Sequence, residues 1–325
     1  MLVYQTDSTD PAFNLALEEV LTRRSKKDAV FLWRNAPSII IGRNQNAYGE
    51  IDVDYVRRRE IPVVRRMTGG GAVFHDLGNV NFSFVTEATE DAPLSFGRFT
   101  APVVKYLERL GVPACFSGRN DIEIDGQKIS GNAQTQLGSR FLHHGTLLFD
   151  VHMSDLSAAL KVNPLKIQSK GIRSVRARVT NICEHLREPM SVEEFKAGLT
   201  AFFAGQPGAK LTEFTREELA AAGKLADEKY RRWEWNFGEN PSYSFRKAAR
   251  FSGGILEVFM NVADEVVADV HITGDFFGFG EISDLEQALC GTPHRREALE
   301  AVLRDLPVKK YLGAITAEEL IETMF

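Results

Sequence analysis

A two-residue turn signal inside an alternating stretch most constrains how this chain can fold. Residues 113 to 136 read PACFSGRNDIEIDGQKISGNAQTQ, in which apolar and polar residues alternate on both sides of Asp125-Gly126. Alternation is typical of β-strands, and Asp-Gly is a preferred two-residue hairpin loop because both residues tolerate positive φ. The pattern therefore predicts a β-hairpin in which Glu123 faces Lys128.

The same register places Ile122 opposite Ile129 and leaves two interpretations of Lys128 open. In the first, Lys128 forms an ordinary cross-strand ion pair with Glu123 on a solvated face, which stabilises the fold by well under ~1 kcal/mol. In the second, Lys128 projects into a cleft as a point charge for a phosphate or a carboxylate.

The second informative stretch is RRMTGGGAVFHD at residues 65 to 76, where three glycines follow two arginines. Backbone amides without Cβ atoms can approach a ligand's oxygens closely, and the arginines add fixed positive charge. The stretch taken alone fits either an anion site or a tight turn with solvated arginines. It lacks the G-x-G-x-x-G spacing, and no G-x-x-x-x-G-K-[ST] occurs in the chain, so neither nucleotide fingerprint supports it.

A basic segment, KVNPLKIQSKGIRSVRARVTNI, follows at residues 161 to 182 and contains no acidic residue. Such a segment could fold over a polyphosphate, dock an acidic protein or remain a solvated loop. The chain as a whole has 39 basic and 44 acidic residues, a formal charge of −5, which does not favour nucleic acid as a partner.

Composition narrows the class of protein further. A chain of 325 residues predicts one large domain and one small domain. The three cysteines are far apart, which indicates a reducing compartment without disulfides, and we expect a cytoplasmic protein. The chain starts MLVYQTDSTD, without a secretion signal, and no apolar run is long enough to span a membrane.

The histidines and cysteines favour ordinary structural roles. His143-His144 are adjacent, a poor spacing for zinc, and one of them is expected to be buried or hydrogen-bonded. His75 and Asp76 are expected to be loop scaffolding. Cys115 could be a nucleophile only beside a base, and we expect a small buried strand residue instead.

Apolar spacing and turn signals divide the first 240 residues into helices and strands. Helices are expected at about 11–24, 102–110, 191–203 and 215–232, the third opened by the capping box at Ser191. Short β-rich runs predict strands at AVFLWRN, SIIIG and IPVVRRM, the last of which leads into the glycine run.

The periodic pattern ends near residues 236 to 247, where Gly, Pro and Ser collect, and we expect a domain boundary there. Beyond it, GGILEVFMNVADEVVADVHITGDF predicts an antiparallel meander, and residues 283 to 325 predict helices. This tail is expected to be a small α+β accessory domain, and the chain has no internal repeat.

Five stretches in one order resemble a known family. RRMTGGGAVFHDLGNVNFSF, SGRNDIEIDGQKISGNAQ, HHGTLLFD, KGIRSVRARVTNI and WEWNFG look like the lipoate–protein ligase family in its long bacterial form. The resemblance covers nearly the whole chain. It implies an α/β fold: a mixed-sheet catalytic domain of the biotin/lipoate ligase type at residues 1–242, and the accessory domain at residues 248–325.

The resemblance also implies a reaction in two steps. ATP and lipoate form lipoyl-AMP and pyrophosphate, with Mg²⁺ assisting, and the acyl group then passes to a lysine of a lipoyl-domain protein. The implied acceptors are the E2 subunits of 2-oxoacid dehydrogenases and the H protein of glycine cleavage. The implied role is lipoate salvage, by a protein that we expect to be a monomer.

Site residues are carried over by motif. Lys128 is the implied catalytic cation, and Asp121 is the implied contact to Mg²⁺ through the phosphates. The implied adenylate-binding residues are Arg66, Gly70, Gly71, Ala72, Val73, Phe74, Asn79, Asn120, Asp121 and Lys128. The implied adenylate-covering loop contains Lys170, Gly171, Ser174 and Val175.

Two alternatives remain beside this interpretation. An octanoyl- or lipoyl-transferase of the same fold would work without ATP through a cysteine thioester, for which Cys115 is the candidate near a motif. A noncatalytic lipoyl-binding protein would have lost Lys128 or the glycines, yet all are present. The basic segment and the C-terminal extension favour the adenylating enzyme.

Overall fold

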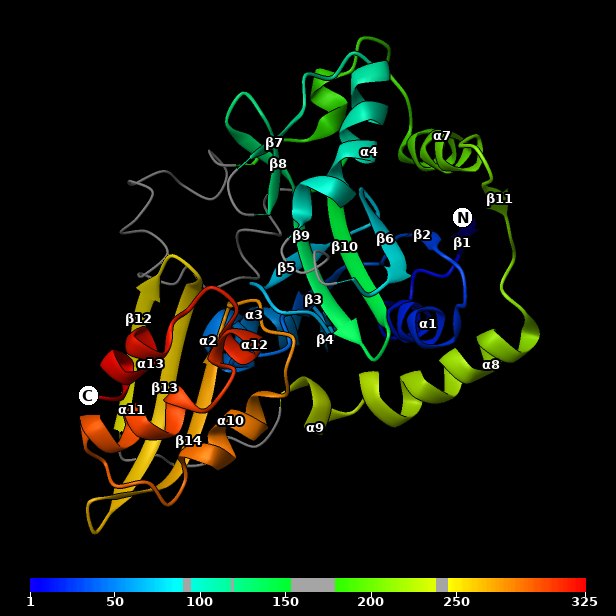
Figure 1. The fold of residues 1–325 in the computed structure, drawn as a ribbon. Helices are drawn as coiled ribbons and strands as arrows, with labels where there is room; N and C mark the ends of the chain where they lie inside the picture. The colour runs from blue at the N-terminus through cyan, green and yellow to red at the C-terminus, as the bar shows by residue number, and fades with distance from the viewer. Residues whose placement is uncertain (90–94, 118–119, 153–178, 238–244) are drawn as a thin grey trace.

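A computed structural model describes residues 1–89, 95–117, 120–152, 179–237 and 245–325 of the chain (Figure 1). Its largest element is an eight-stranded sheet in the order β11-β1-β2-β6-β10-β9-β8-β7. Strand β1 pairs in parallel with β2 and β11, and the other pairings in this sheet are antiparallel. The predicted mixed α/β architecture is therefore confirmed. The strands are β1 (Leu2–Gln5), β2 (Ala29–Trp33), β6 (Asn79–Glu87), β7 (Cys115–Ser117), β8 (Asp121–Ile124), β9 (Gln127–Leu137), β10 (Arg140–Leu148) and β11 (Lys210–Leu211).

Helices cover both faces of this sheet. On one face α4 (Phe96–Arg109) and α7 (Val192–Ala204) pack on a core that includes Phe82 and Phe141. On the other face α1 (Pro11–Arg24) and α8 (Arg216–Leu225) pack against a second core around Trp33. The sheet is thus buried on both faces, which lets apolar strands carry a few internal polar groups without exposing the core to water.

The helices with a side-chain cap in the sequence begin where they were predicted, whereas the helix that contains Pro102 does not. α1 begins at Pro11 because the Asp10 carboxylate accepts hydrogen bonds from the amides of Ala12 and Phe13. The capping box at Ser191 is present, and α7 follows it as predicted. α4 instead begins at Phe96, so the predicted start at Pro102 is wrong. An interior proline removes one hydrogen bond and crowds the carbonyl of the preceding turn, yet α4 contains Pro102 in its second turn.

The predicted helix at 215–232 divides into three pieces. α8 ends at Leu225, a π-helical turn, η3 (Ala226–Tyr230), continues it, and α9 (Trp233–Asn236) follows. A short 3-10 helix, η2 (Ile182–His185), precedes α7. Tyr230 is fully buried and donates its hydroxyl hydrogen to Glu19 at 2.7 Å, which ties this segment to α1.

A separate three-stranded sheet in the order β4-β3-β5 carries the glycine run. Its strands are β3 (Ser38–Ile41), β4 (Val63–Arg65) and β5 (Val73–His75), and the short helices α2 (Ala47–Glu50) and α3 (Val53–Arg58) lie between β3 and β4 in the chain. The predicted strands before and after Pro37 therefore belong to two different sheets. The glycines form the connection from β4 to β5, which we call the glycine loop (residues 66–72).

The predicted hairpin is present as β8 and β9. Asp125 and Gly126 have φ of 50° and 76°, and Glu123 faces Lys128 as predicted. The predicted pairing of Ile122 with Ile129 is wrong, because a β-bulge shifts the register and Ile122 faces Ser130 instead. Both isoleucines are fully buried, so the bulge brings both to the core.

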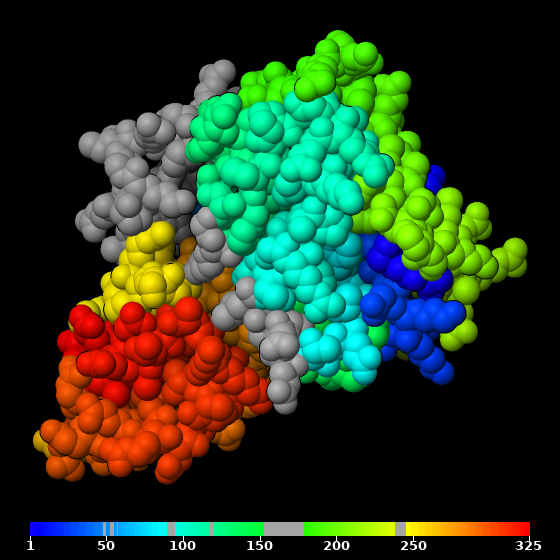
Figure 2. Space-filling model, turned by 45° about the horizontal axis from the view of Figure 1, so that its top comes forward, coloured from blue at the N-terminus to red at the C-terminus, as the bar shows by residue number. Residues whose placement is uncertain are grey.

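The C-terminal region, residues 245–325, forms its own lobe, coloured yellow to red in Figure 2. An antiparallel meander of β12 (Phe245–Phe251), β13 (Gly254–Ala263) and β14 (Val266–Gly274) packs on α10 (Ile282–Leu289), α11 (Arg296–Arg304), α12 (Val308–Leu312) and α13 (Ala317–Met324). The predicted meander and helices are confirmed, with β12 as an additional strand. No helix among the described residues is long and apolar enough to cross a membrane.

Candidate active site

A cavity of about 120 Å³ lies where the eight-stranded sheet meets the glycine loop. It is lined by strands β2, β3, β5, β6, β9 and β10, by α1 and by one residue of the C-terminal region. Residues from both predicted motifs line this one cavity. They are Arg66, Gly70, Gly71, Ala72, Val73, Asn120 and Lys128.

The other predicted residues lie around the cavity or outside the described chain. Phe74 is buried in a core with Ile39, on the face of β5 turned away from the cavity. Asn79 is fully buried and donates to Asn81 Oδ1 at 3.0 Å, and Asn81 lines the cavity. The predicted covering-loop residues Lys170, Gly171, Ser174 and Val175 lie outside the described residues.

Arg66 holds the glycine loop in shape. Its guanidinium donates to the carbonyls of Ile40 at 3.0 Å, Gly69 at 2.8 Å and Gly71 at 2.9 Å, and its Nε donates to Thr68 Oγ1 at 2.9 Å. Only 5% of Arg66 is exposed. A charged donor therefore pairs with three backbone acceptors and one hydroxyl, which is how a buried guanidinium is tolerated.

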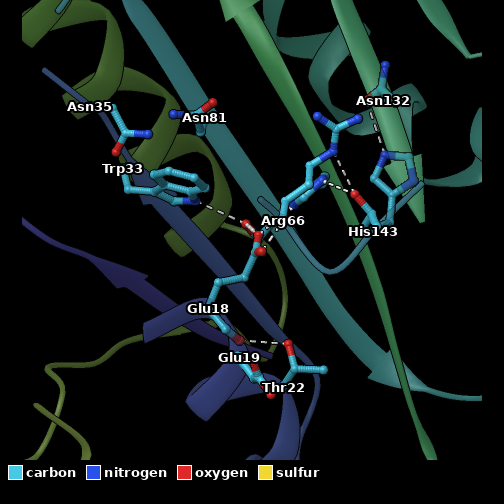
Figure 3. A network of polar contacts seen from close by, with 12 residues as sticks. Glu18, Glu19, Thr22, Trp33, Asn35, Arg66, Asn81, Asn132 and His143 are labelled. Atoms are coloured by element: carbon cyan, nitrogen blue, oxygen red, sulfur yellow. Dashed lines mark hydrogen bonds and ion pairs between the residues drawn. The ribbon is translucent and has the colours of Figure 1, made fainter. Parts of the chain in front are cut away.

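A buried acid supports this arginine (Figure 3). Glu18 Oε1 lies 2.9 Å from His144 Nδ1, and His144 Nε2 lies 2.8 Å from the Thr68 hydroxyl that also contacts Arg66. Glu18 also accepts from Ser83 at 2.5 Å. Burial lowers the pKa of Arg66 to about 10 even though the nearby Glu18 carboxylate acts in the opposite direction. This chain of contacts joins α1 and β10 to the glycine loop.

Arg65 points away from the cavity and anchors α9. It donates to the carbonyls of Trp235 and Asn236, both at 2.9 Å, and to that of Gln45 at 2.7 Å. In return, Trp235 Nε1 donates to the Arg65 carbonyl at 2.8 Å. The two neighbouring arginines thus bind different parts of the protein. Arg65 binds the WEWNFG stretch, and Arg66 binds the glycine loop.

The glycine loop requires its glycines because other groups approach it closely. Gly70 has φ of 90°, and a Cβ there would lie 2.9 Å from Phe277 Cε1 and 3.1 Å from Arg66 Nη2. A Cβ on Gly42 would lie 1.9 Å from the Gly70 carbonyl oxygen. The loop is therefore tightly packed as well as unusually folded, and a side chain at either position would displace it.

Lys128 faces the cavity from the hairpin and is the more available cation. Its side chain is 36% exposed, and its Nζ lies 2.7 Å from Asp121 Oδ1. The carboxylate that it reaches is thus Asp121, although Glu123 is its cross-strand neighbour. A Cβ on Gly131 would lie 2.9 Å from this Nζ, so Gly131 leaves the room in which the ammonium sits.

Sequence reasoning missed several residues that line the cavity. Trp33 donates to Ser83 Oγ at 3.1 Å, and Asn132 contacts His143 Nε2 through Oδ1 at 3.2 Å. Both lie on strands whose alternation predicts burial but not which face holds a cavity. Phe277 comes from a distant part of the chain, and no sequence signal links it to the other lining residues.

The histidines are buried and hydrogen-bonded. His143 is fully buried, and its Nδ1 lies 3.0 Å from Gln134 Nε2, which confirms the expectation for the His143-His144 pair. His75, expected to be scaffolding, lines the cavity and lies 3.1 Å from Asn35 Nδ2 through its Nδ1. Burial, together with the nearby Arg66 and His144, lowers the pKa of His75 to about 3.

Cys115 corrects one expectation. It lies on β7 at the edge of the sheet and is exposed, so the prediction of a buried strand residue was wrong. An edge strand has one face without a neighbouring strand, and the hairpin pattern could not reveal which strand would be the edge. Cys115 does not line the cavity.

The fold and the cavity define a two-region α/β protein whose cavity has cationic and apolar walls, and sequence comparison gives the family. Residues 10–204 match the lipoyl protein ligase A/B catalytic domain, and residues 240–324 match the bacterial lipoate protein ligase C-terminus. The chain belongs to the lipoate–protein ligase family.

Curated relatives and solved structures agree with this assignment. Lipoate–protein ligase 1 of Staphylococcus aureus is 43% identical over 97% of both chains. Lipoate-protein ligase LplJ of Bacillus subtilis is 42% identical, also over 97% of both.

Three solved structures add information about ligands and partners. LipL1 of P. falciparum in complex with lipoate superposes with a TM-score of 0.83 and 26% identity over 99% of this chain and 98% of that chain. A lipoate-protein ligase A bound with ATP has a TM-score of 0.63 and 30% identity over 73% and 98%. A bi-partite lipoate protein ligase from Thermoplasma acidophilum, described with its E2 lipoyl domain, has a TM-score of 0.65 and 32% identity over 75% and 98%.

Proposed function

We propose that this enzyme uses ATP to attach free lipoate to a lysine of lipoyl-domain proteins, in two steps through lipoyl-AMP. The observation that carries the proposal is that Lys128 and the Arg66 glycine loop line one cavity although they lie far apart in sequence. The relatives named above support both substrates, since one solved structure holds lipoate and another holds ATP.

Lys128 supplies mobile positive charge at the reacting end of the cavity. In the first step a carboxylate oxygen of lipoate attacks the α-phosphorus of ATP, and pyrophosphate leaves, so negative charge builds up on the transferring phosphoryl group. An ammonium that can move from Asp121 to these oxygens offsets that charge in a partly dry site. In the second step the acceptor amine attacks the acyl carbon and AMP leaves, and the same cation stabilises the oxyanion.

The apolar side of the cavity suits the tail of lipoate. Leu15, Trp33, Ile40 and Val73 line it from α1, β2, β3 and β5. Binding an apolar tail here places the carboxylate toward Lys128, and this orientation lowers the entropy cost of the first step. We propose as well that Lys170, Gly171, Ser174 and Val175 of the basic segment belong to a loop that covers the adenylate.

The proposed acceptors are lipoyl domains of E2 subunits and the glycine-cleavage H protein. The T. acidophilum relative is described together with its E2 lipoyl domain, which supports this class of partner. We propose further that the enzyme is monomeric and acts in the cytoplasm, where it would salvage free lipoate. The domain division is proposed between residues 242 and 248, and the second bound lies inside β12 (Phe245–Phe251).

Magnesium is proposed as the companion of ATP, with Asp121 as its contact on the protein. The donor chemistry fits, because Mg²⁺ is commonly held by one or two carboxylates together with substrate phosphates. When bound, the ion would neutralise phosphate charge. Asp121 also holds Lys128 at 2.7 Å, so it has a structural reason to be present as well.

The substitution Asp121→Asn tests this contact. Removing the carboxylate should raise the Mg²⁺ concentration needed for half-maximal activity and lower the maximal rate by about tenfold. Magnesium titrations of both proteins at saturating ATP would measure this shift, with Asp125→Asn in the hairpin turn as the matched control. An unchanged titration curve would remove Asp121 from the metal site.

The decisive experiment for the proposed function is lipoate-dependent exchange between ATP and radiolabelled pyrophosphate. Purified protein should show exchange with lipoate and Mg·ATP, and transfer of lipoate to a lipoyl domain should follow. Absence of exchange, combined with transfer from an acylated donor protein, would favour the ATP-independent transferase. Binding of lipoate without either activity would indicate a noncatalytic binding protein.

A further inference from the structure

A single buried carboxylate is connected to three residues that line the cavity. Glu18 lies on α1, is fully buried and does not line the cavity itself. Trp33 of β2, His144 of β10 and Arg66 of the glycine loop do line it. Two arms of hydrogen bonds lead from these residues to Glu18 (Figure 3). The direction of each bond follows from which partner can donate and which can accept.

The first arm begins at Trp33 and runs through Ser83. The indole Nε1 can only donate, and it lies 3.1 Å from Ser83 Oγ. The Ser83 hydroxyl in turn donates to Glu18 Oε1 at 2.5 Å. Ser83 is fully buried and does not line the cavity, so the N–H of Trp33 is bonded within the protein.

The second arm begins at Arg66 and runs through Thr68 and His144. Arg66 Nε donates to Thr68 Oγ1 at 2.9 Å, and the Thr68 hydroxyl hydrogen is then directed to His144 Nε2 at 2.8 Å. Because a ring nitrogen that accepts carries no hydrogen, we assign His144 as the neutral ring that donates through Nδ1 to Glu18 at 2.9 Å. A carboxylate only accepts, so Glu18 is the end of both arms.

The register of the sheet places Trp33 far from Lys128 across the cavity. Trp33 pairs with Asn81 of β6, and Asn81 pairs with Thr146 of β10. The Gly131 amide of β9 donates to Thr146 Oγ1, and Gly131 is the residue beside Lys128 Nζ. Trp33 is thus three strands from Gly131, which is about 14 Å at the usual spacing of strands. A substrate whose carboxylate binds at Lys128 therefore extends its tail toward Trp33.

We propose that Glu18 is a positioning residue for the acyl substrate, which keeps the N–H groups of Trp33 and His144 bonded within the cavity wall. The inference rests on the proposed function, because the tail that meets this wall is that of lipoate. An apolar tail that covers an unpaired N–H removes it from water without replacing its hydrogen bond, which weakens binding. Since Glu18 accepts from both arms, the tail meets rings whose polar hydrogens already have partners.

The substitution Glu18→Leu, made in the full chain, removes the acceptor from both arms. The rate of pyrophosphate exchange would be measured against lipoate and against ATP separately. The KM for lipoate should rise by about tenfold, because its tail must cover the freed N–H groups, and the KM for ATP should change little. A loss of folded protein alone would lower the maximal rate and leave both KM values unchanged.

Glu19→Leu is the matched control, because Glu19 is the next residue of α1 and is also a buried carboxylate. Its partners Arg23, Lys229 and Tyr230 do not line the cavity. This substitution should therefore destabilise the fold and leave the KM for lipoate unchanged. An unchanged KM for lipoate in Glu18→Leu, or an equal rise in Glu19→Leu, would overturn the assignment.

Ser83→Ala provides the test if Glu18→Leu does not fold. It removes only the first arm, so the KM for lipoate should rise several-fold, and an unchanged value would overturn the inference. Failure of the wild type to exchange would instead reject the proposed function. Calorimetric titration with lipoate in the absence of ATP still tests the inference in that case. Weaker binding by Ser83→Ala and Glu18→Leu than by the wild type supports it, and equal affinity overturns it.

Discussion

The glycine loop and the β8–β9 hairpin each bring a cation to the same cavity, yet the two cations are held in opposite ways. Arg66 is buried and donates to three backbone carbonyls and a threonine hydroxyl. Lys128 is 36% exposed and contacts one carboxylate, that of Asp121. The donors of Arg66 are therefore occupied by groups of the protein, whereas the Lys128 ammonium is accessible to a ligand.

This difference shows that positive charge beside a cavity is not by itself a catalytic group. A guanidinium whose donors are occupied by carbonyls stabilises a shape, and moving it would leave several buried acceptors unpaired. An ammonium on a flexible stem can leave a carboxylate and follow charge as it develops. We therefore expect changes at Lys128 to affect activity, and changes at Arg66 to affect stability first.

Replacement of Lys128 by alanine should have the largest effect. The rate of pyrophosphate exchange should fall by roughly a hundred- to a thousandfold, the usual result of removing one transition-state charge partner. The free energy of unfolding should change little, because the side chain is half-buried and makes a single ion pair. Exchange assays and urea titrations measure the two effects. Glu123→Gln, the cross-strand neighbour, serves as control and should retain exchange; wild-type exchange in Lys128→Ala would contradict the comparison.

Replacement of Arg66 by methionine should lower the free energy of unfolding by about 3–5 kcal/mol, since it removes a buried charge from its partners. The carbonyls of Ile40, Gly69 and Gly71 would lose their donor, and Glu18 would lose a neighbouring cation. Urea unfolding would measure the loss, with the exposed Arg98→Met as control. A fully stable variant with reduced exchange would show that Arg66 acts mainly on the ligand.

Gly70→Ala should cost about 2–3 kcal/mol, from positive φ combined with the contacts to Phe277 and Arg66. The matched variant is Gly126→Ala in the hairpin turn, where φ is 76° and nothing lies within 4 Å of the added methyl group. It should cost only about 1 kcal/mol, the backbone contribution alone. Thermal or urea unfolding of both variants separates crowding from backbone strain. Equal losses would mean that the docked Phe277 does not restrict the loop.

A pH dependence of stability is also predicted, and it arises from a histidine beside the glycine loop. The pKa of His75 is lowered to about 3 by burial, whereas an unfolded histidine titrates near 6.5. Between these values the unfolded chain binds a proton that the folded chain does not. The contribution of His75 to the free energy of unfolding is therefore fully present above about pH 6.5. It falls by up to about 1.4 kcal/mol per pH unit as the pH decreases toward 3.

Urea unfolding at several pH values between 7.5 and 5 tests this dependence. Replacement of His75 by glutamine should flatten the slope, although the buried His143, whose pKa burial also lowers, should leave part of it. Exposed His152 provides the control, and His152→Gln should keep the wild-type slope. The same slope in His75→Gln as in the wild type would contradict the assignment.

Signals within one turn or one helix were readable from the sequence. The capping box at Ser191 and the Asp125-Gly126 turn work through hydrogen bonds and φ values of neighbouring residues, and both are present as predicted. The bulge at Ile122 and the exposure of Cys115 were not readable. Register beyond the turn and the identity of the edge strand depend on which strands pack together.

In the candidate site, too, some features could be predicted from the sequence and others could not. The order of the motifs predicted that Arg66, the glycines and Lys128 belong to one binding site, and in the structure they line one cavity. The partners of Arg66 could not be predicted from these motifs. Its Nε donates to Thr68, and Thr68 contacts His144 of β10, which in turn contacts Glu18 of α1, so this arrangement depends on how α1 and β10 pack on the glycine loop.

The sequence by itself determined the family, the α/β class with its C-terminal extension, and the residue types that meet in the site. These follow from motif order and from periodicity, which are properties of the chain alone. Only the tertiary structure decided which arginine turns inward, which carboxylate holds Lys128, and that Phe277 of the C-terminal region lines the cavity. Contacts between residues distant in sequence depend on how whole elements pack, and no local pattern records that packing.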